Sequence, residues 1–173
     1  VSFMPFKNFL SSSEINNIYN KLFKSSSIKI ATVPFSDGGG GLIDVFSDQH
    51  SETKKIKIKN CFNRKHYCKI LINKKKGFGL VEIIDTMGKT QTKDNDPLKR
   101  SSYGVGQCIL YLSKFNLKKI YIGTGGSINT DCGIGMAHAL GLKFYDSNNN
   151  LLNQKKTFFN AKYLDKIANI DYS

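Results

Sequence analysis

Two glycine clusters, each following a predicted strand, constrain this fold more than any other feature of the sequence. The first, Gly38–Gly41, follows a β-branched stretch over 28–33, and the second, Gly123–Gly126, follows the apolar run "KIYI". A strand, a glycine turn and a helix N-terminus together expose backbone N–H groups at which phosphate or carboxylate binds. A tight turn that requires positive φ explains the same glycines. The sequence therefore predicts either an anion site or a structural turn at each cluster.

Strand and helix patterns alternate in the first and last parts of the chain. Apolar residues recur at helical spacing over 11–23 and 101–115, and a shorter helix is expected over 42–49. This alternation predicts an α/β fold, a parallel sheet flanked by helices in the three-layer arrangement of Rossmann- and flavodoxin-like folds. Because ligands of such sheets collect beyond the carboxyl ends of the strands, we expect both glycine clusters to face one crevice.

The middle of the chain has a different pattern. Three strand-like runs between 54 and 84 are separated by Lys/Asn-rich turns, as in an antiparallel meander. We therefore predict an α/β lobe over 1–50 and 95–173, with a smaller β-rich inserted segment over 51–94.

Composition excludes several classes of protein. The chain has 173 residues, 40% of them hydrophobic, with no apolar run long enough to cross a bilayer and no signal-peptide pattern, so we expect a cytoplasmic protein without membrane partners. The four cysteines form no CxxC pair, which argues against zinc and disulfides. The net charge of +13 comes from lysines scattered among Asn, Ser and Ile. We attribute it to compositional bias and expect no nucleic-acid partner.

Two aspartates and a lysine near the glycine clusters are candidate catalytic residues. Asp37 and Asp131 each lie in a glycine-rich loop, where a carboxylate can hold Mg²⁺ or accept a proton from a hydroxyl. Lys7 follows the first strand-like stretch and can supply positive charge for a phosphate. The alternatives are a helix cap for Asp131 and a solvated amine for Lys7.

Three blocks of this sequence resemble one family. "FMPFKNFLSS" is similar to the pattern PDSFKGSLSA, and "VPFSDGGGGLIDVF" is similar to IPxADGGEGTxDAL. The long block "SSYGVGQCILYLSKFNLKKIYIGTGGSINTDCGIGMAHALGLKFYD" resembles TTYGVGELIxxALDxGxxxIxIGIGGSATNDGGAGMxxALGxxFxD. These are the patterns of the bacterial glycerate kinases of the GGSATNDGG type. A further segment, "GLVEIIDTMGKT", resembles xxxIExAxASGL with Glu82 in register.

The resemblance implies transfer of the γ-phosphoryl group of ATP to a hydroxyl of D-glycerate, assisted by Mg²⁺, with 2-phosphoglycerate favoured over 3-phosphoglycerate. By matching position it implies Asp37, Lys7 and Asp131 as catalytic residues and Asp37 as the metal ligand. The implied substrate- and phosphate-binding residues are Gly38, Gly39, Gly125, Gly126, Ser127 and Glu82.

Departures from the family patterns favour a second hypothesis. Met4 replaces an aspartate, Gly40 replaces a glutamate and Cys132 replaces a glycine. The match also ends where family members continue, so we expect an N-terminal part of an incomplete fold, a fragment or a processed product. The alternative to an active kinase is a degenerate fragment that keeps the fold and at most binds an anion. Assembly as a homo-oligomer and completion by a C-terminal part both stay open.

Overall fold

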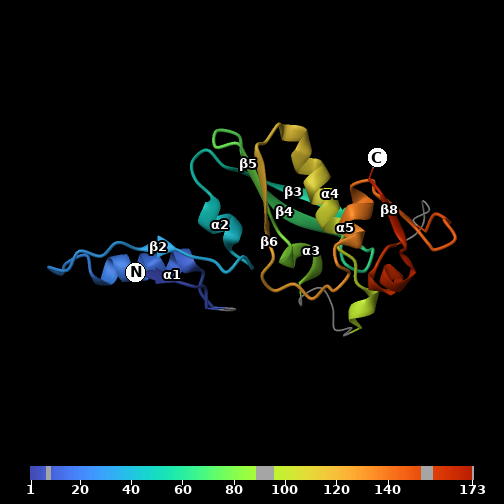
Figure 1. The fold of residues 1–173 in the computed structure, drawn as a ribbon. Coiled ribbons are helices and arrows are strands. Elements are labelled where there is room, and N and C mark those ends of the chain that lie inside the picture. Colours follow the sequence, from blue (N-terminus) through green and yellow to red (C-terminus); the bar gives the residue numbers. More distant parts are fainter. Residues whose placement is uncertain (7–8, 89–95, 153–157, 173) are drawn as a thin grey trace.

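The computed structural model describes residues 1–6, 9–88, 96–152 and 158–172 (Figure 1). The elements in chain order are β1 (Ser2–Phe3), α1 (Ser12–Leu22), β2 (Val33–Pro34), α2 (Leu42–Phe46), β3 (Glu52–Lys59), β4 (Lys65–Asn73), β5 (Phe78–Glu82), α3 (Ile84–Met87), η2 (Pro97–Lys99), α4 (Tyr103–Leu112), η3 (Ser113–Phe115), β6 (Lys119–Gly123), α5 (Ile134–Ala139), β7 (Lys143–Tyr145), η4 (Ala161–Lys166) and β8 (Asn169–Asp171).

A four-stranded mixed sheet in the order β3-β4-β5-β6 forms the centre of the molecule. β3, β4 and β5 pair antiparallel, which confirms the meander expected from the alternating Lys/Ile pattern, and β6 joins β5 in parallel. The strands β3, β4 and β5 therefore share one sheet with β6, and the predicted division into an α/β lobe and a smaller β-rich inserted segment stays a prediction. The physical reason for the shared sheet is the apolar β5, whose residues are all buried and need a partner on each side.

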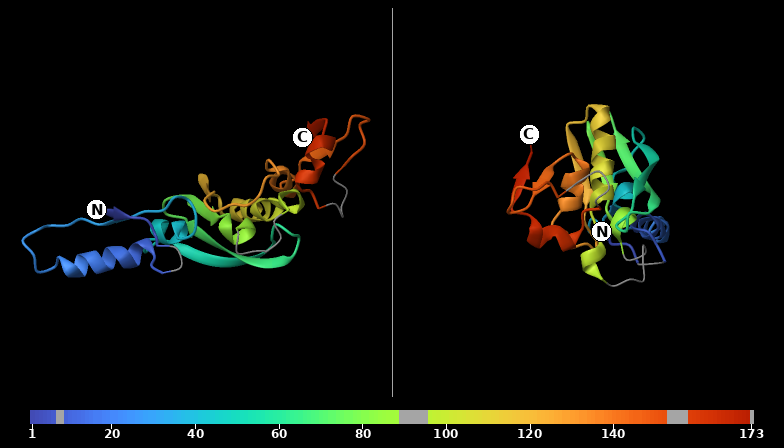
Figure 2. Two further views of the ribbon diagram at one scale, coloured as in Figure 1. Left: turned by 90° about the horizontal axis from the view of Figure 1, so that it is seen from below. Right: turned by 90° about the vertical axis from the view of Figure 1, so that its right-hand side faces the viewer.

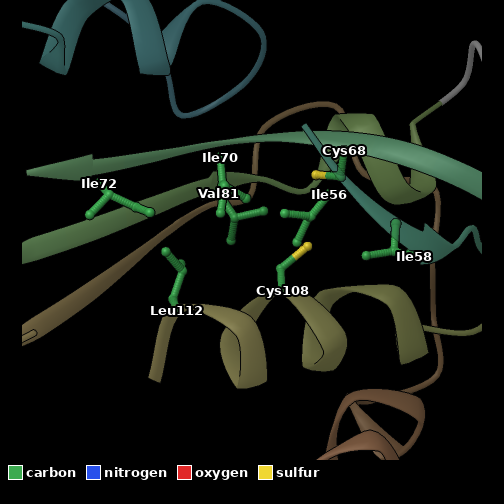
Figure 3. Packing of buried hydrophobic residues seen from close by; sticks show 8 residues of the cluster. All are labelled: Ile56, Ile58, Cys68, Ile70, Ile72, Val81, Cys108 and Leu112. Carbon is green, nitrogen blue, oxygen red and sulfur yellow. The ribbon is translucent and has the colours of Figure 1, made fainter. Parts of the chain in front are cut away.

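Helices cover both faces of the sheet. On one face, α4 contributes Cys108 and Leu112 to a cluster with isoleucines of β3 and β4, and Figure 3 shows these side chains meeting between helix and sheet. On the other face, Ile43 of α2 packs against Leu71 and Leu80. The expected α/β fold, with helices on both sides of a partly parallel sheet, is confirmed.

The N-terminal residues form a small unit at one end of an elongated molecule (Figure 2). β1 pairs with β2 in parallel, and α1 packs against both. Ser11 and Glu14 form a reciprocal capping box that fixes the start of α1, which is the helix predicted over 11–23. The strand predicted over 28–33 is much shorter, since pairing begins only at Val33.

The last part of the chain packs at the other end of the sheet (Figure 2). α5 lies against α4 where Gly106 allows the backbone of Met136 to approach closely. β7 and β8 form a separate antiparallel pair beside a cluster around Phe144 and Phe159. No helix in the described part of the chain is both long and apolar enough to cross a bilayer.

Leu112 and Leu110 give a matched test of the helix–sheet interface. Leu112 is fully buried, so Leu112→Ala should lower the free energy of unfolding by about 2–5 kcal/mol through lost burial and a residual cavity. Leu110→Ala, at a position 43% exposed on the same helix, should change it little. Urea unfolding followed by circular dichroism measures both, and equal losses would contradict this placement of α4.

Candidate active site

The two glycine clusters meet in the structure. We call residues 35–41, which follow β2, the aspartate loop, and residues 123–127, which end β6, the glycine loop. The N–H of Gly125 donates to the carbonyl of Gly38 at 2.9 Å, so the two loops are joined backbone to backbone. The two clusters lie together as predicted, but the strands that precede them belong to different sheets, because β2 pairs with β1 and β6 pairs with β5.

Glycine is required at this contact because the backbones are too close for a side chain. A Cβ on Gly125 would overlap the backbone of Gly39, and one on Gly123 would lie 2.6 Å from the Gly38 carbonyl oxygen. Gly38 also has φ of +87°, in the left-handed region. Close backbone contact and a left-handed turn therefore explain why glycine stands at Gly38, Gly123 and Gly125.

The backbone N–H groups expected to hold an anion are mostly bonded within the protein. Gly38 donates to Ser36 Oγ at 3.2 Å, Gly39 donates to Asp37 Oδ1 at 2.9 Å, and Gly125 donates to Gly38. The contact between the loops and the turns at Ser36 and Asp37 use these three N–H groups, and the predicted phosphate-binding role of Gly38, Gly39 and Gly125 stays a prediction. Two other residues of the glycine loop are predicted to bind phosphate. Gly126 lines the pocket described next, and Ser127 is exposed.

A pocket of about 500 Å³ lies between the N-terminal unit and the aspartate loop. Its wall includes the exposed carboxylates Asp37 and Asp44, the start of α1 at Ser11, and Ile84. Asp44 Oδ1 also pairs with Lys69 Nζ at 3.2 Å. The pocket thus presents two carboxylates, apolar surface and a helix start, a combination that suits a small polar ligand.

Lys7 lies outside the described residues, so its predicted role stays a prediction. Phe6 and Phe9, which flank that part of the chain, both line the pocket. Met4, where the family pattern has an aspartate, lines it as well.

Asp44 is a pocket carboxylate that the sequence analysis missed. It stands seven residues after Asp37 inside the same matched block, in the first turn of α2. Its position in "GLIDVF" could have indicated a pocket residue. An acidic residue in the first turn of a helix is also explained by its favourable interaction with the helix dipole.

Glu82 lies outside the pocket lining and supports the site through α2. Its carboxylate accepts a 2.6 Å hydrogen bond from the N–H of Ile43, in the first turn of α2. Burial raises the pKa of Glu82, and the nearby carboxylates of Asp85 and Asp44 raise it further. Its position thus fixes where α2 begins, directly after the aspartate loop.

Asp131 is a buried carboxylate at the start of α5. Its Oδ2 accepts from the N–H of Ser102 at 2.7 Å, from Ser102 Oγ at 2.8 Å and from the N–H of Gly135 at 3.1 Å. Its Oδ1 accepts from the N–H of Gly133 at 3.1 Å and from Asn129 Nδ2. These bonds tie the loop after β6 to the first turns of α4 and α5.

Asp131 does not line the pocket that contains Asp37. The Asp131 carboxylate is enclosed by backbone, hydroxyl and amide donors, and its predicted catalytic role alongside Asp37 stays a prediction. Asp131 is not the N-cap of α5, which is Gly133, although its Oδ2 accepts from the N–H of Gly135 in the first turn of that helix. The next residue, Cys132, is exposed and has φ of +50°, at the position where the family pattern has glycine.

Parallel strands that end in touching loops beside a carboxylate-lined pocket define an α/β protein with a ligand site at its strand ends. The chain belongs to the glycerate kinase family, whose model matches residues 1–173. It is 31% identical over 154 residues to the glycerate kinase of Neisseria meningitidis, covering 85% of this chain and 40% of that protein. It is 28% identical over 174 residues to the glycerate 2-kinase of Escherichia coli, covering 97% of this chain and 44% of that protein.

A crystal structure from Salmonella typhimurium LT2, of a protein provisionally assigned as glycerate kinase 2, has the same fold. The TM-score is 0.78 at 23% identity, over 98% of this chain and 45% of that chain. This chain therefore spans less than half the length of these relatives.

Gly125 and Gly40 give a matched test of the loop contact. Gly125→Ala should lower the free energy of unfolding by about 1–3 kcal/mol, because the added methyl group forces the two loops apart. Gly40→Ala, where nothing lies within 4 Å of the new Cβ, should be neutral. Thermal unfolding of both variants makes the comparison, and a neutral Gly125→Ala would show that the loops do not touch.

The raised pKa of Glu82 predicts a pH dependence of stability. Between its ordinary value near 4.5 and the higher pKa of the folded state, the folded protein holds the proton more tightly, so the contribution of Glu82 to stability falls as pH rises. Glu82→Gln keeps an acceptor for Ile43 and removes this loss. The unfolding free energy of Glu82→Gln minus that of the unchanged protein should increase from pH 4.5 towards neutral, and a decrease would contradict the buried placement.

Proposed function

We propose that this chain carries a catalytic part of a glycerate kinase, which transfers the γ-phosphoryl group of ATP to a hydroxyl of D-glycerate. The observation that carries the proposal is Asp37, held at the end of a parallel strand by loop-to-loop contact and facing a pocket large enough for glycerate. Membership of the glycerate kinase family supports it. Similarity to the glycerate 2-kinase of E. coli favours the 2-hydroxyl as the acceptor.

Asp37 is the residue best suited to accept a proton from the substrate hydroxyl. It is exposed to the pocket, and the N–H of Gly39 orients one of its oxygens at 2.9 Å, which leaves the other oxygen available. Gly126 and Ser127, at the neighbouring rim, are proposed to contact the phosphate. Lys7 is proposed to supply positive charge for the phosphate.

The carboxylates of the pocket fit a magnesium ion that is also bound to the phosphates of ATP. No cluster of three or more His, Cys, Asp or Glu suited to a metal occurs among the described residues. Magnesium, however, commonly uses one or two protein carboxylates together with phosphate oxygens and water, and Asp37 with Asp44 meets that need. When bound, the ion would neutralise the charge of the phosphates during transfer.

The second candidate is a family member without catalysis that binds an anion at most. The engaged N–H groups of Gly38, Gly39 and Gly125 favour it, as does the enclosed carboxylate of Asp131.

A coupled ADP-release assay with D-glycerate, ATP and Mg²⁺ tests the kinase proposal, on this chain and on a form extended through any downstream coding sequence. Asp37→Asn should lower kcat by about 10²–10⁴-fold, because the variant cannot accept the hydroxyl proton. The control is Asp165→Asn, an exposed carboxylate of η4 outside the pocket lining.

Turnover that survives Asp37→Asn would overturn the assignment of that residue. Absence of turnover in both forms, combined with thermal stabilisation by nucleotide, would establish the non-catalytic alternative.

A further inference from the structure

The pocket carboxylate Asp44 shares one of its oxygens with a lysine of the sheet. Its Oδ1 accepts a hydrogen bond from Nζ of Lys69 at 3.2 Å, and the two side chains form an ion pair. Among the described residues, no hydrogen bond reaches Oδ2 of Asp44. A carboxylate with one engaged and one available oxygen can still bind a second positive charge. Asp44 is therefore shared between Lys69 and any cation that enters the pocket.

Lys69 has a fixed backbone and a flexible side chain. It lies within β4, opposite Lys55 of β3, and its N–H donates to Oδ2 of Asp85 at 3.2 Å. The ammonium group is carried on a flexible hydrocarbon stem, and the Lys69 side chain is 41% exposed. Lys69 can therefore move its charge away from Asp44 while β4 and α2 stay in place.

The ion pair between Lys69 and Asp44 is weak enough to be exchanged. The Asp44 side chain is 56% exposed, and ion pairs between exposed charges contribute little because water screens them. A magnesium ion carries twice the charge of an ammonium group and commonly binds one or two protein carboxylates together with phosphate oxygens. Two cations close to one carboxylate repel each other. Lys69 and a divalent cation therefore compete for Asp44.

We propose that Lys69 holds Asp44 as its counter-ion until a divalent cation bound to nucleotide phosphates displaces it. Lys69 thereby lowers the affinity of the pocket for the free cation, whereas the phosphates offset its repulsion when the cation is bound to a nucleotide. Lys69 is not part of the pocket lining and acts through Asp44, as a positioning residue. The inference rests on the proposed function, because it takes Asp44 as one of the carboxylates that meet the ion.

Free Mn²⁺, which substitutes for Mg²⁺ and is followed by electron paramagnetic resonance, tests the competition on the full chain. Lys69→Met removes the competing charge and should tighten Mn²⁺ binding about two- to fivefold, the range expected for an exposed ion pair. Lys69→Arg keeps the charge and should bind Mn²⁺ like the unchanged chain. Circular dichroism confirms that each variant folds.

Two further variants separate the effect of this ion pair from that of the overall charge. Lys76→Met removes the same charge from another exposed pair, in which Lys76 Nζ lies 2.8 Å from Asp48 Oδ2, outside the pocket lining. This variant should leave Mn²⁺ binding unchanged. In an Asp44→Asn background, Lys69→Met should also have no effect, because no carboxylate is left for it to release.

The nucleotide gives a second comparison. When the titration is repeated with Mn²⁺ and saturating ADP, the gain from Lys69→Met should fall below about twofold, because the phosphates already offset the charge of Lys69. Neither titration needs turnover. A chain that binds Mn²⁺ as expected and transfers no phosphoryl group would contradict the proposed function and support the role of Lys69.

The proposed role of Lys69 is overturned if Lys69→Met binds free Mn²⁺ as the unchanged chain does, or more weakly. It is also overturned if Lys76→Met gives the same gain, or if the gain persists without Asp44, because the effect would then belong to the overall charge. An equal gain with and without ADP would contradict the role of the phosphates. Absence of Mn²⁺ binding in every form would exclude Asp44 from a cation site, and with it the role of Lys69.

Discussion

The hydrogen bond between the Gly125 N–H and the Gly38 carbonyl joins two loops that are 87 positions apart in the chain. Everything at the pocket depends on this contact. It fixes the aspartate loop against the end of β6, and Glu82 then fixes the first turn of α2 beside it. Asp37 in the aspartate loop and Asp44 in α2 are thereby brought into the wall of one pocket.

Local sequence patterns were sufficient for most elements of the fold. The capping box at Ser11 and Glu14, the alternation of β3 and β4, and the helical spacing of α4 are properties of neighbouring residues, and each element formed where expected. The parallel pairing of β6 with β5 was not foreseen, because it depends on a partner some forty positions away that periodicity does not identify.

The site was predicted less completely than the fold. The residues at the loop junction were found because glycine and aspartate stand out in a sequence. Whether a backbone N–H is free cannot be read from composition, and three of the expected donors proved to be engaged. Asp131 likewise has a residue type that suits catalysis, but residue type alone does not show that five hydrogen bonds enclose its carboxylate.

Cys132 gives the molecule a distinctive chemical property. The other three cysteines are buried, so this thiol is the single one that a reagent in solution can reach directly. It adjoins Asp131, whose bonds connect β6 to α4 and α5. A fluorophore or spin label attached there would report on the junction of three elements without the removal of any competing cysteine. Its left-handed backbone also means that glycine at this position would relieve conformational strain.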